Sequence, residues 1–210
     1  MNKNKDIIFL ASQSASRKQL LSYAAIPFKI LDHTTNEKLV KQTGSFYEYI
    51  LAIAQHKMNH VLLPSPDTIQ DNYLFVLTAD SLTYDKSTGI IFGKPKDMHD
   101  ARRMLKHKFG KLIEVATGCC LEKKIIKNNE WITEQKKEWV TSGEIEFLLS
   151  DQDIDVYLKK MPEALYASGA GIIENFGLSF LKSIRGSYTA VMGLPLYELR
   201  QALTTLSFKF

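Results

Sequence analysis

Several features that would place the 210-residue chain in a specialised class are scarce. It has two cysteines, Cys119 and Cys120, adjacent in a segment that we expect to be a strand. Neighbouring strand side chains point to opposite faces, so a disulfide between these two residues would be strained. The pair fits neither a disulfide framework nor a zinc-binding pattern, and we expect two small buried residues.

Long hydrophobic runs are also missing from the sequence. No stretch is long enough to cross a bilayer, and the first residues lead into an expected strand without a long apolar signal region. We therefore expect a cytoplasmic protein that does not act at a membrane.

Neither sign of charge is in large excess. Lys and Arg number 27 against 23 Asp and Glu, which gives a net charge of +4. This mild excess suits a small polyanionic ligand but is too small to indicate a nucleic-acid partner. The aromatic residues are not interleaved with a basic stripe, so we also expect no single-stranded nucleic acid to bind.

Familiar metal and nucleotide motifs are absent as well. The 5 histidines show no ligand spacing, and the 11 glycines form neither a Walker loop nor a dinucleotide fingerprint. Asp151, Asp153 and Asp155 lack the glycine and terminal glutamate of a calcium loop, so we interpret them as the acidic first turn of a capped helix.

The most informative stretch lies near the start of the chain and is typical of a strand leading into a helix. An apolar run over residues 7–10 is followed by a small polar turn, in which Ser14 is a suitable N-cap for a helix carrying Leu20 and Leu21. A helix N-terminus with Arg17 close by can bind a phosphate. On this stretch alone, an ordinary capped helix with two solvated cations is the favoured interpretation.

The order of the expected elements indicates the fold class. Strands are expected near residues 7–10, 28–31, 74–81, 112–123, 130–147 and 178–184, with helices after residues 14, 45, 97, 150 and 194. Strand–helix alternation followed by a long hairpin predicts an α/β fold with a mixed twisted sheet flanked by helices. With no repeat or linker, we expect residues 1–210 to form a single domain, either compact or of two lobes sharing a cleft.

Polar residues gather at the expected strand ends and in adjoining loops. They are Ser12, Ser14, Arg17, Glu37, Lys57, Asp80 and Lys94. Cations together with one or two carboxylates are what a magnesium-dependent phosphate site requires. An acid closing an apolar strand is costly unless paired or metal-bound, which favours a functional role for Asp80. Taken alone, Lys57 would be a solvated helix lysine and Glu37 a loop acid.

These motifs, in their order along the chain, form a recognisable set. They are Leu10-Ala11-Ser12-x-Ser14-x-x-Arg17, Asn36-Glu37, Ala54-Gln55-x-Lys57, Ala79-Asp80-Ser81, Gly93-Lys94-Pro95, Gly186-Ser187-Tyr188 and Gly193-Leu194-Pro195. The set resembles the motifs of the Maf family of nucleotide pyrophosphatases, and the likeness extends from about residue 7 to residue 203.

The resemblance implies an ITPase-like fold with two lobes and a central cleft. It also implies hydrolysis of a nucleoside triphosphate to the monophosphate and pyrophosphate, with a divalent metal cation such as Mg, Mn or Co. Ser12, Ser14, Arg17, Lys57 and Lys94 would contact the nucleotide. Glu37 and Asp80 would serve the metal and the attacking water, with Asp80 as general base. The family is associated with septum formation, and a homodimer is compatible with it.

Departures from the family pattern bear on which nucleotide base the protein recognises. The motif's Pro-Arg is Ala15-Ser16 here, and Ser81 stands where the family has threonine. Glu174 occupies the place of a glutamine and resembles the branch that handles 7-methyl-GTP. A carboxylate can accept hydrogen bonds from the N1–H and N2–H₂ edge of guanine, whereas glutamine suits uracil or thymine. We therefore expect a 7-methyl-GTP-like substrate; the alternatives are a dTTP/UTP pyrophosphatase and a nucleotide-binding division regulator with little turnover.

Overall fold

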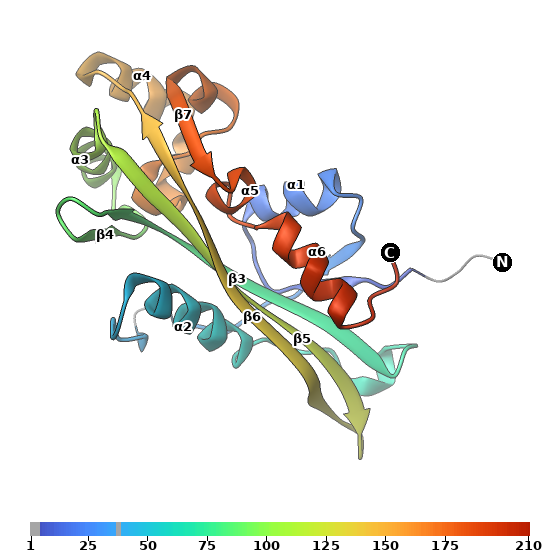
Figure 1. Cartoon of the computed structure of the whole chain (residues 1–210). Helices are drawn as coiled ribbons and strands as arrows, with labels where there is room; N and C mark the ends of the chain where they lie inside the picture. The colour runs from blue at the N-terminus through green and yellow to red at the C-terminus, as the bar shows by residue number, and fades with distance from the viewer. Residues whose placement is uncertain (1–4, 37–38) are drawn as a thin grey trace. The chain divides into compact units, whose positions relative to one another are not determined.

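The computed structural model describes residues 5–36 and 39–210, and this chain divides into two compact units. The first unit comprises residues up to Asp80 with 118–140 and 193–210, and the second comprises 81–117 and 141–192. Three long strands contribute residues to both units: β3 (Tyr73–Asp85), β5 (Leu112–Lys127) and β6 (Glu130–Phe147) (Figure 1). The α/β class with a mixed sheet is confirmed, whereas a single domain over residues 1–210 stays a prediction.

In the first unit, β1 (Ile8–Leu10) lies between β2 (Phe28–Ile30) and β3 and is parallel to both. Leu10 is level with Ile30 on one side and with Leu77 on the other. Parallel strands end at the same edge of a sheet, so the turn that follows β1 lies beside the middle of β3.

The helices of the first unit cover both faces of these strands. Figure 1 shows α2 (Phe46–Met58) on one side, and α1 (Ala15–Tyr23) and α6 (Leu196–Thr205) on the other. A short 3₁₀ helix, η2 (Pro66–Thr68), lies between α2 and β3. Ser14 caps α1, as predicted, and Ser45 caps α2 with a complete capping box. Pro195 is the N-cap of α6 and not its first residue, because its ψ of 95° is extended.

The alternation of side chains along β3 divides the core of the first unit into two layers. Leu74 and Val76 pack in a cluster with Ala54 and Met58 of α2 and with Cys120. Phe75 points to the other face, where its ring contacts Phe208 at 5.0 Å between centroids. Cys119 and Cys120 are both buried and unbridged, as the sequence predicts.

The second unit combines short strands with six helical segments. β4 (Ile90–Phe92) is antiparallel to the end of β3, and β7 (Leu181–Gly186) is antiparallel to β6. The helical segments are α3 (Met98–Lys108), α4 (Asp151–Lys160), η3 (Pro162–Tyr166), η4 (Ser168–Ala170) and η5 (Asn175–Phe180), and a single turn, α5 (Tyr188–Val191), follows β7.

The strand predicted at 178–184 begins later, at Leu181. Residues 175–180 form η5 instead, because Gly177 approaches the Ile172 carbonyl closely and the Phe180 ring packs against Phe147 and Tyr157. Tertiary contacts therefore override the apolar run that suggested a strand.

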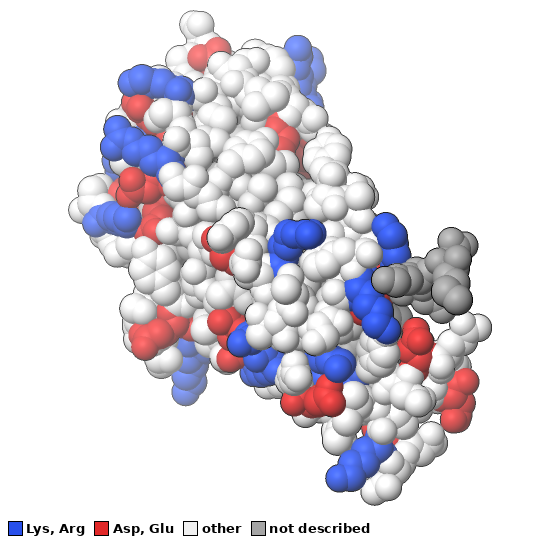
Figure 2. Space-filling model, turned by 45° about the vertical axis from the view of Figure 1, so that its right-hand side comes forward, with Lys and Arg blue, Asp and Glu red and all other residues white. Residues whose placement is uncertain are grey.

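The surface agrees with the balanced composition. Figure 2 shows basic and acidic side chains interspersed over the face in view. Within residues 5–36 and 39–210, no helix is both long enough and apolar enough to span a bilayer.

Candidate functional site

In the first unit, the motif that contains Ser12 and the motif that contains Asp80 lie on the neighbouring strands β1 and β3. The Ala11 N–H donates to the Leu77 carbonyl at 2.9 Å, so the polar turn after β1 starts beside β3. Asp80 lies further along β3, beyond Leu77, which is the last residue of that strand paired with β1. The sequence placed Asp80 at the end of its strand; the structure continues β3 to Asp85, because residues 83–85 pair with β4.

Ser12 and Arg17 form the first cluster, at the N-terminus of α1. The Arg17 guanidinium donates from Nη1 to Ser12 Oγ at 3.0 Å and from Nε to the Gly193 carbonyl at 2.8 Å. The Ser14 N–H donates to Ser12 Oγ at 3.3 Å, and Ser14 Oγ accepts from the Arg17 N–H. Arg17 is buried, so its charge is fixed beside the helix N-terminus, an arrangement suited to a phosphate group.

Lys57 and Asp80 form the second cluster, a buried ion pair. Lys57 Nζ lies 2.5 Å from Asp80 Oδ1, and the two residues are 4% and 6% exposed. The same ammonium donates to the Ala79 carbonyl at 3.5 Å. No described residue forms a hydrogen bond with Asp80 Oδ2, which leaves one carboxylate oxygen able to bind a water or a cation.

The seating of α2 on the sheet explains why this pair forms. Thr78 and Asp80 lie on the same face of β3, and the Thr78 hydroxyl donates to the Ala54 carbonyl of α2 at 2.8 Å. Lys57 comes one helical turn after Ala54 and so reaches Asp80. On β5, a Cβ at Gly118 would lie 2.9 Å from the Ile50 carbonyl oxygen. Glycine at this position therefore allows the helix backbone to approach the strand.

The segment that leads toward Glu37 is fixed beside the end of α2. The Thr34 N–H donates to the His60 carbonyl at 3.0 Å, the Leu62 N–H donates to the Asp32 carbonyl at 2.9 Å, and His33 bridges to Val61. Glu37, predicted as a metal ligand, lies outside the described residues.

Two further predicted residues lie in the second unit. Lys94 is exposed and Glu174 is half-buried. Their segments are linked, because the Gly169 N–H, five residues before Glu174, donates to the carbonyl of Gly93 at 2.8 Å. The Glu174 carbonyl accepts from the Gly177 N–H at 2.9 Å. The described structure thus places Ser12, Ser14, Arg17, Lys57 and Asp80 in one unit and Lys94 and Glu174 in the other.

The donor set allows a metal without forming a closed cage. Among residues 5–36 and 39–210, no group of three or more His, Cys, Asp or Glu side chains could hold an ion. Mg²⁺ commonly binds through one or two carboxylates, waters and substrate phosphates, so Asp80, whose Oδ2 bonds to no residue within the described ranges, fits such a cation.

Sequence reasoning missed two contributions. The Gly193 carbonyl fixes Arg17, whereas the sequence places this glycine only in a motif. Lys108 is buried beneath the segment that contains Gly169. Neither residue has a local sequence signal, because both act on partners more than 60 residues away.

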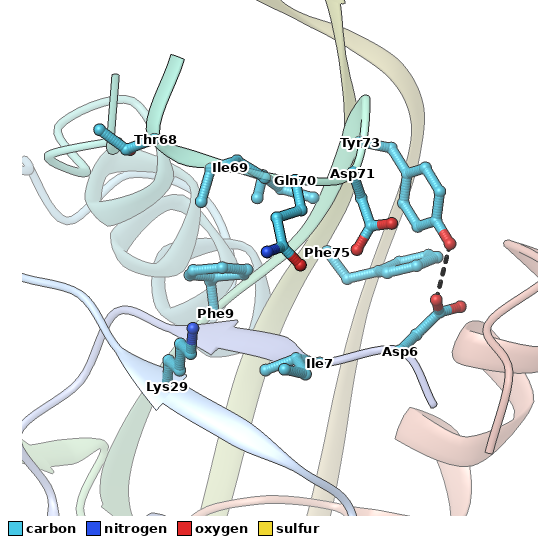
Figure 3. A pocket seen from close by; sticks show the side chains of 11 residues that line it. Asp6, Ile7, Phe9, Lys29, Thr68, Ile69, Gln70, Asp71, Tyr73 and Phe75 are labelled. Carbon is cyan, nitrogen blue, oxygen red and sulfur yellow. Dashed lines mark hydrogen bonds between the residues drawn. The ribbon is translucent and has the colours of Figure 1, made fainter. Parts of the chain in front are cut away.

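A cavity of about 340 Å³ lies elsewhere in the first unit, next to β1 and the start of β3. Figure 3 shows the Asp6 and Tyr73 side chains pointing toward each other at its edge, joined by a hydrogen bond of 2.7 Å from the Tyr73 hydroxyl. This bond raises the pKa of Tyr73 to about 12. Of the predicted site residues that the structure describes, none lines the cavity.

Comparisons with known proteins identify the family of this chain. The family model for Maf, described as "Maf-like protein", matches residues 7–206. The chain is 33% identical over 191 residues to a dTTP/UTP pyrophosphatase of Acholeplasma laidlawii, covering 90% of this chain and 91% of the relative. It is 34% identical over 195 residues to the enzyme of that name from Bacillus cytotoxicus, covering 92% of each chain. The protein from Ruminiclostridium cellulolyticum with the same name is 32% identical over 202 residues, covering 96% of this chain and 97% of the relative. The chain therefore belongs to the Maf family.

Proposed function

We propose that this protein hydrolyses a nucleoside triphosphate to the monophosphate and pyrophosphate. The buried Lys57–Asp80 pair on a strand that neighbours the Ser12–Arg17 turn is the observation that carries the proposal. It combines a carboxylate with two buried cations, the groups needed to activate water near a polyphosphate. The names of the relatives describe the same reaction class.

In the proposed reaction, a water attacks the α-phosphorus while Asp80 accepts its proton. The bond from the α-phosphorus to the bridging oxygen breaks, and pyrophosphate leaves with the electron pair. Arg17 and Lys57 stabilise the phosphate charge, and Ser12 and Ser14 orient the phosphates; Lys94 is proposed as a further phosphate contact. A divalent cation held by Asp80 and Glu37 would neutralise additional phosphate charge.

For the base, we propose dTTP or UTP as the preferred substrate. The support is the similarity over nearly the whole chain to relatives named for these two nucleotides. The second candidate is 7-methyl-GTP, favoured by the carboxylate of Glu174, which can accept hydrogen bonds from guanine and complements a positively charged base. Glu174→Gln separates the two: it should move kcat/KM toward the pyrimidine nucleotides if this carboxylate contacts the base, and an unaltered profile rejects that contact.

The reaction is tested by pyrophosphate release over a panel of triphosphates with Mg²⁺, Mn²⁺ or Co²⁺. Asp80→Asn should lower kcat by about 10²–10⁴-fold, the usual contribution of a general base. Asp67→Asn, at an exposed acid of the same unit, should leave kcat unchanged. Full turnover by Asp80→Asn would refute the assignment, and tight nucleotide binding without pyrophosphate release would favour the division regulator.

A further inference from the structure

Lys108 is an unusual residue for the interior of a protein. It ends α3, is 3% exposed, and donates from Nζ to the Gly169 carbonyl at 2.5 Å. No carboxylate of the described chain forms an ion pair with it. Burial lowers the pKa of Lys108 to about 7. A buried ammonium without a counter-charge is costly, so its retention calls for an explanation beyond packing.

Two glycines make the space that this ammonium occupies. A Cβ added at Gly169 or at Gly171 would lie 3.0 Å from Lys108 Nζ. Gly169 also has a φ of +62°, which side-chain-bearing residues rarely adopt. The two glycines therefore let the segment from residue 168 to residue 174 pass close to the Lys108 ammonium.

Other hydrogen bonds of this segment reach several parts of the second unit. Ser168 Oγ donates to the Phe92 carbonyl at 2.6 Å and accepts from the Thr83 N–H at 2.9 Å. The Gly169 N–H donates to the Gly93 carbonyl, and the Ile172 N–H donates to the Tyr157 hydroxyl at 2.8 Å. Lys108 donates the hydrogen bond that the Gly169 carbonyl accepts, at a position in the chain between Ser168 and Ile172.

The segment connects the two proposed substrate contacts of this unit. Gly93 directly precedes Lys94, and Glu174 follows Ile172 by two residues. A shift of Gly169 would move the Gly93 carbonyl to which it is bonded, and with it the backbone of Lys94.

We propose that Lys108 is a positioning residue for substrate binding: its bond to Gly169 holds the segment that sets the places of Lys94 and Glu174. The inference rests on the proposed function. Lys108 itself touches no substrate; it acts through the backbone of the segment from residue 168 to residue 174.

The test compares Lys108→Met with Lys108→Gln. The two side chains have the same length, but only glutamine keeps an N–H donor for the Gly169 carbonyl. Lys108→Met should raise KM about tenfold, the typical cost of losing a hydrogen bond to a buried group, and leave kcat within about twofold. Lys108→Gln should restore KM to within about threefold of wild type.

This split separates positioning from a merely structural role. Loss of folded protein lowers apparent kcat and leaves KM unchanged, whereas displacement of binding groups raises KM. Lys106→Met is the matched control, because Lys106 lies on the same helix with its side chain 64% exposed and should keep a wild-type KM.

A KM within twofold of wild type in Lys108→Met, or equal increases in the Met and Gln variants, would overturn the inference. The wild-type assay reports separately on the proposed function. If wild type binds nucleotide without releasing pyrophosphate, that function fails, and the dissociation constants of the same variants replace KM in the comparison. If wild type binds no nucleotide, both proposals are overturned.

Discussion

Replacing Lys108 by methionine should change how the stability of the protein depends on pH. Burial lowers the pKa of Lys108 to about 7 in the folded protein, and the unfolded chain has the ordinary lysine value of about 10.4. Between these values the unfolded chain holds a proton that the folded chain lacks. The free energy of unfolding of the wild type therefore rises with pH in this window, and methionine removes the effect.

The size of the effect follows from the two pKa values. A full difference of one proton gives a slope of about 1.4 kcal/mol per pH unit, and the slope falls to half of that at pH 7. Integrated from pH 6 to pH 8.5, the wild type should gain about 2 kcal/mol relative to Lys108→Met. No discount for solvent screening applies, because the side chain is buried.

Urea unfolding followed by circular dichroism measures this difference at half-unit steps of pH. Burial also raises the pKa of the Cys119 thiol to about 12, which lowers stability at higher pH, but the contribution is common to both proteins and cancels in the comparison. Parallel stability curves that differ by a constant, within about 0.5 kcal/mol across the range, would show that Lys108 keeps its proton in the folded state and would refute the reasoning.

The packing and capping of α2 give two further predictions, each measured by urea unfolding. Gly118→Ala should lower the free energy of unfolding by about 1–3 kcal/mol, because the added Cβ would meet the backbone of Ile50. Gly93→Ala is the control and should change the free energy of unfolding little, because a Cβ there meets nothing within 4 Å. Equal effects of the two substitutions would contradict the packing argument. Ser45→Ala should cost about 1 kcal/mol by removing the cap accepted from the Glu48 N–H at 3.2 Å, and an unchanged midpoint would show that the cap does not contribute.

Local chemistry made part of the fold predictable from the sequence. Ser14 and Ser45 mark the starts of helices because each hydroxyl accepts a hydrogen bond from the backbone N–H three residues later. Such a cap depends only on neighbouring residues. The apolar run before Asp80 predicts a buried strand because a continuous run of apolar side chains is unfavourable in water and must pack in a core. The family motifs likewise give the candidate residues, and the match over residues 7–206 confirms the family.

Other features depend on contacts between distant segments. The apolar stretch around Leu178 becomes a 3₁₀ helix, and the Phe180 ring at its end packs against Phe147, 33 residues earlier in the chain. The sequence likewise indicates no partner for Asp80; α2 supplies Lys57 once Thr78 and Gly118 seat that helix on the sheet.

The sequence by itself determined where the capped helices α1 and α2 begin, and it determined the chemical groups available for a phosphate site. Only the tertiary structure decided which of those groups meet and which charges are buried. Lys106 and Lys108 show why. Both lie in the last turn of α3, yet Lys106 is solvated and Lys108 lies beneath Gly169. Burial depends on what packs over a side chain, and that comes from residues far away in the sequence.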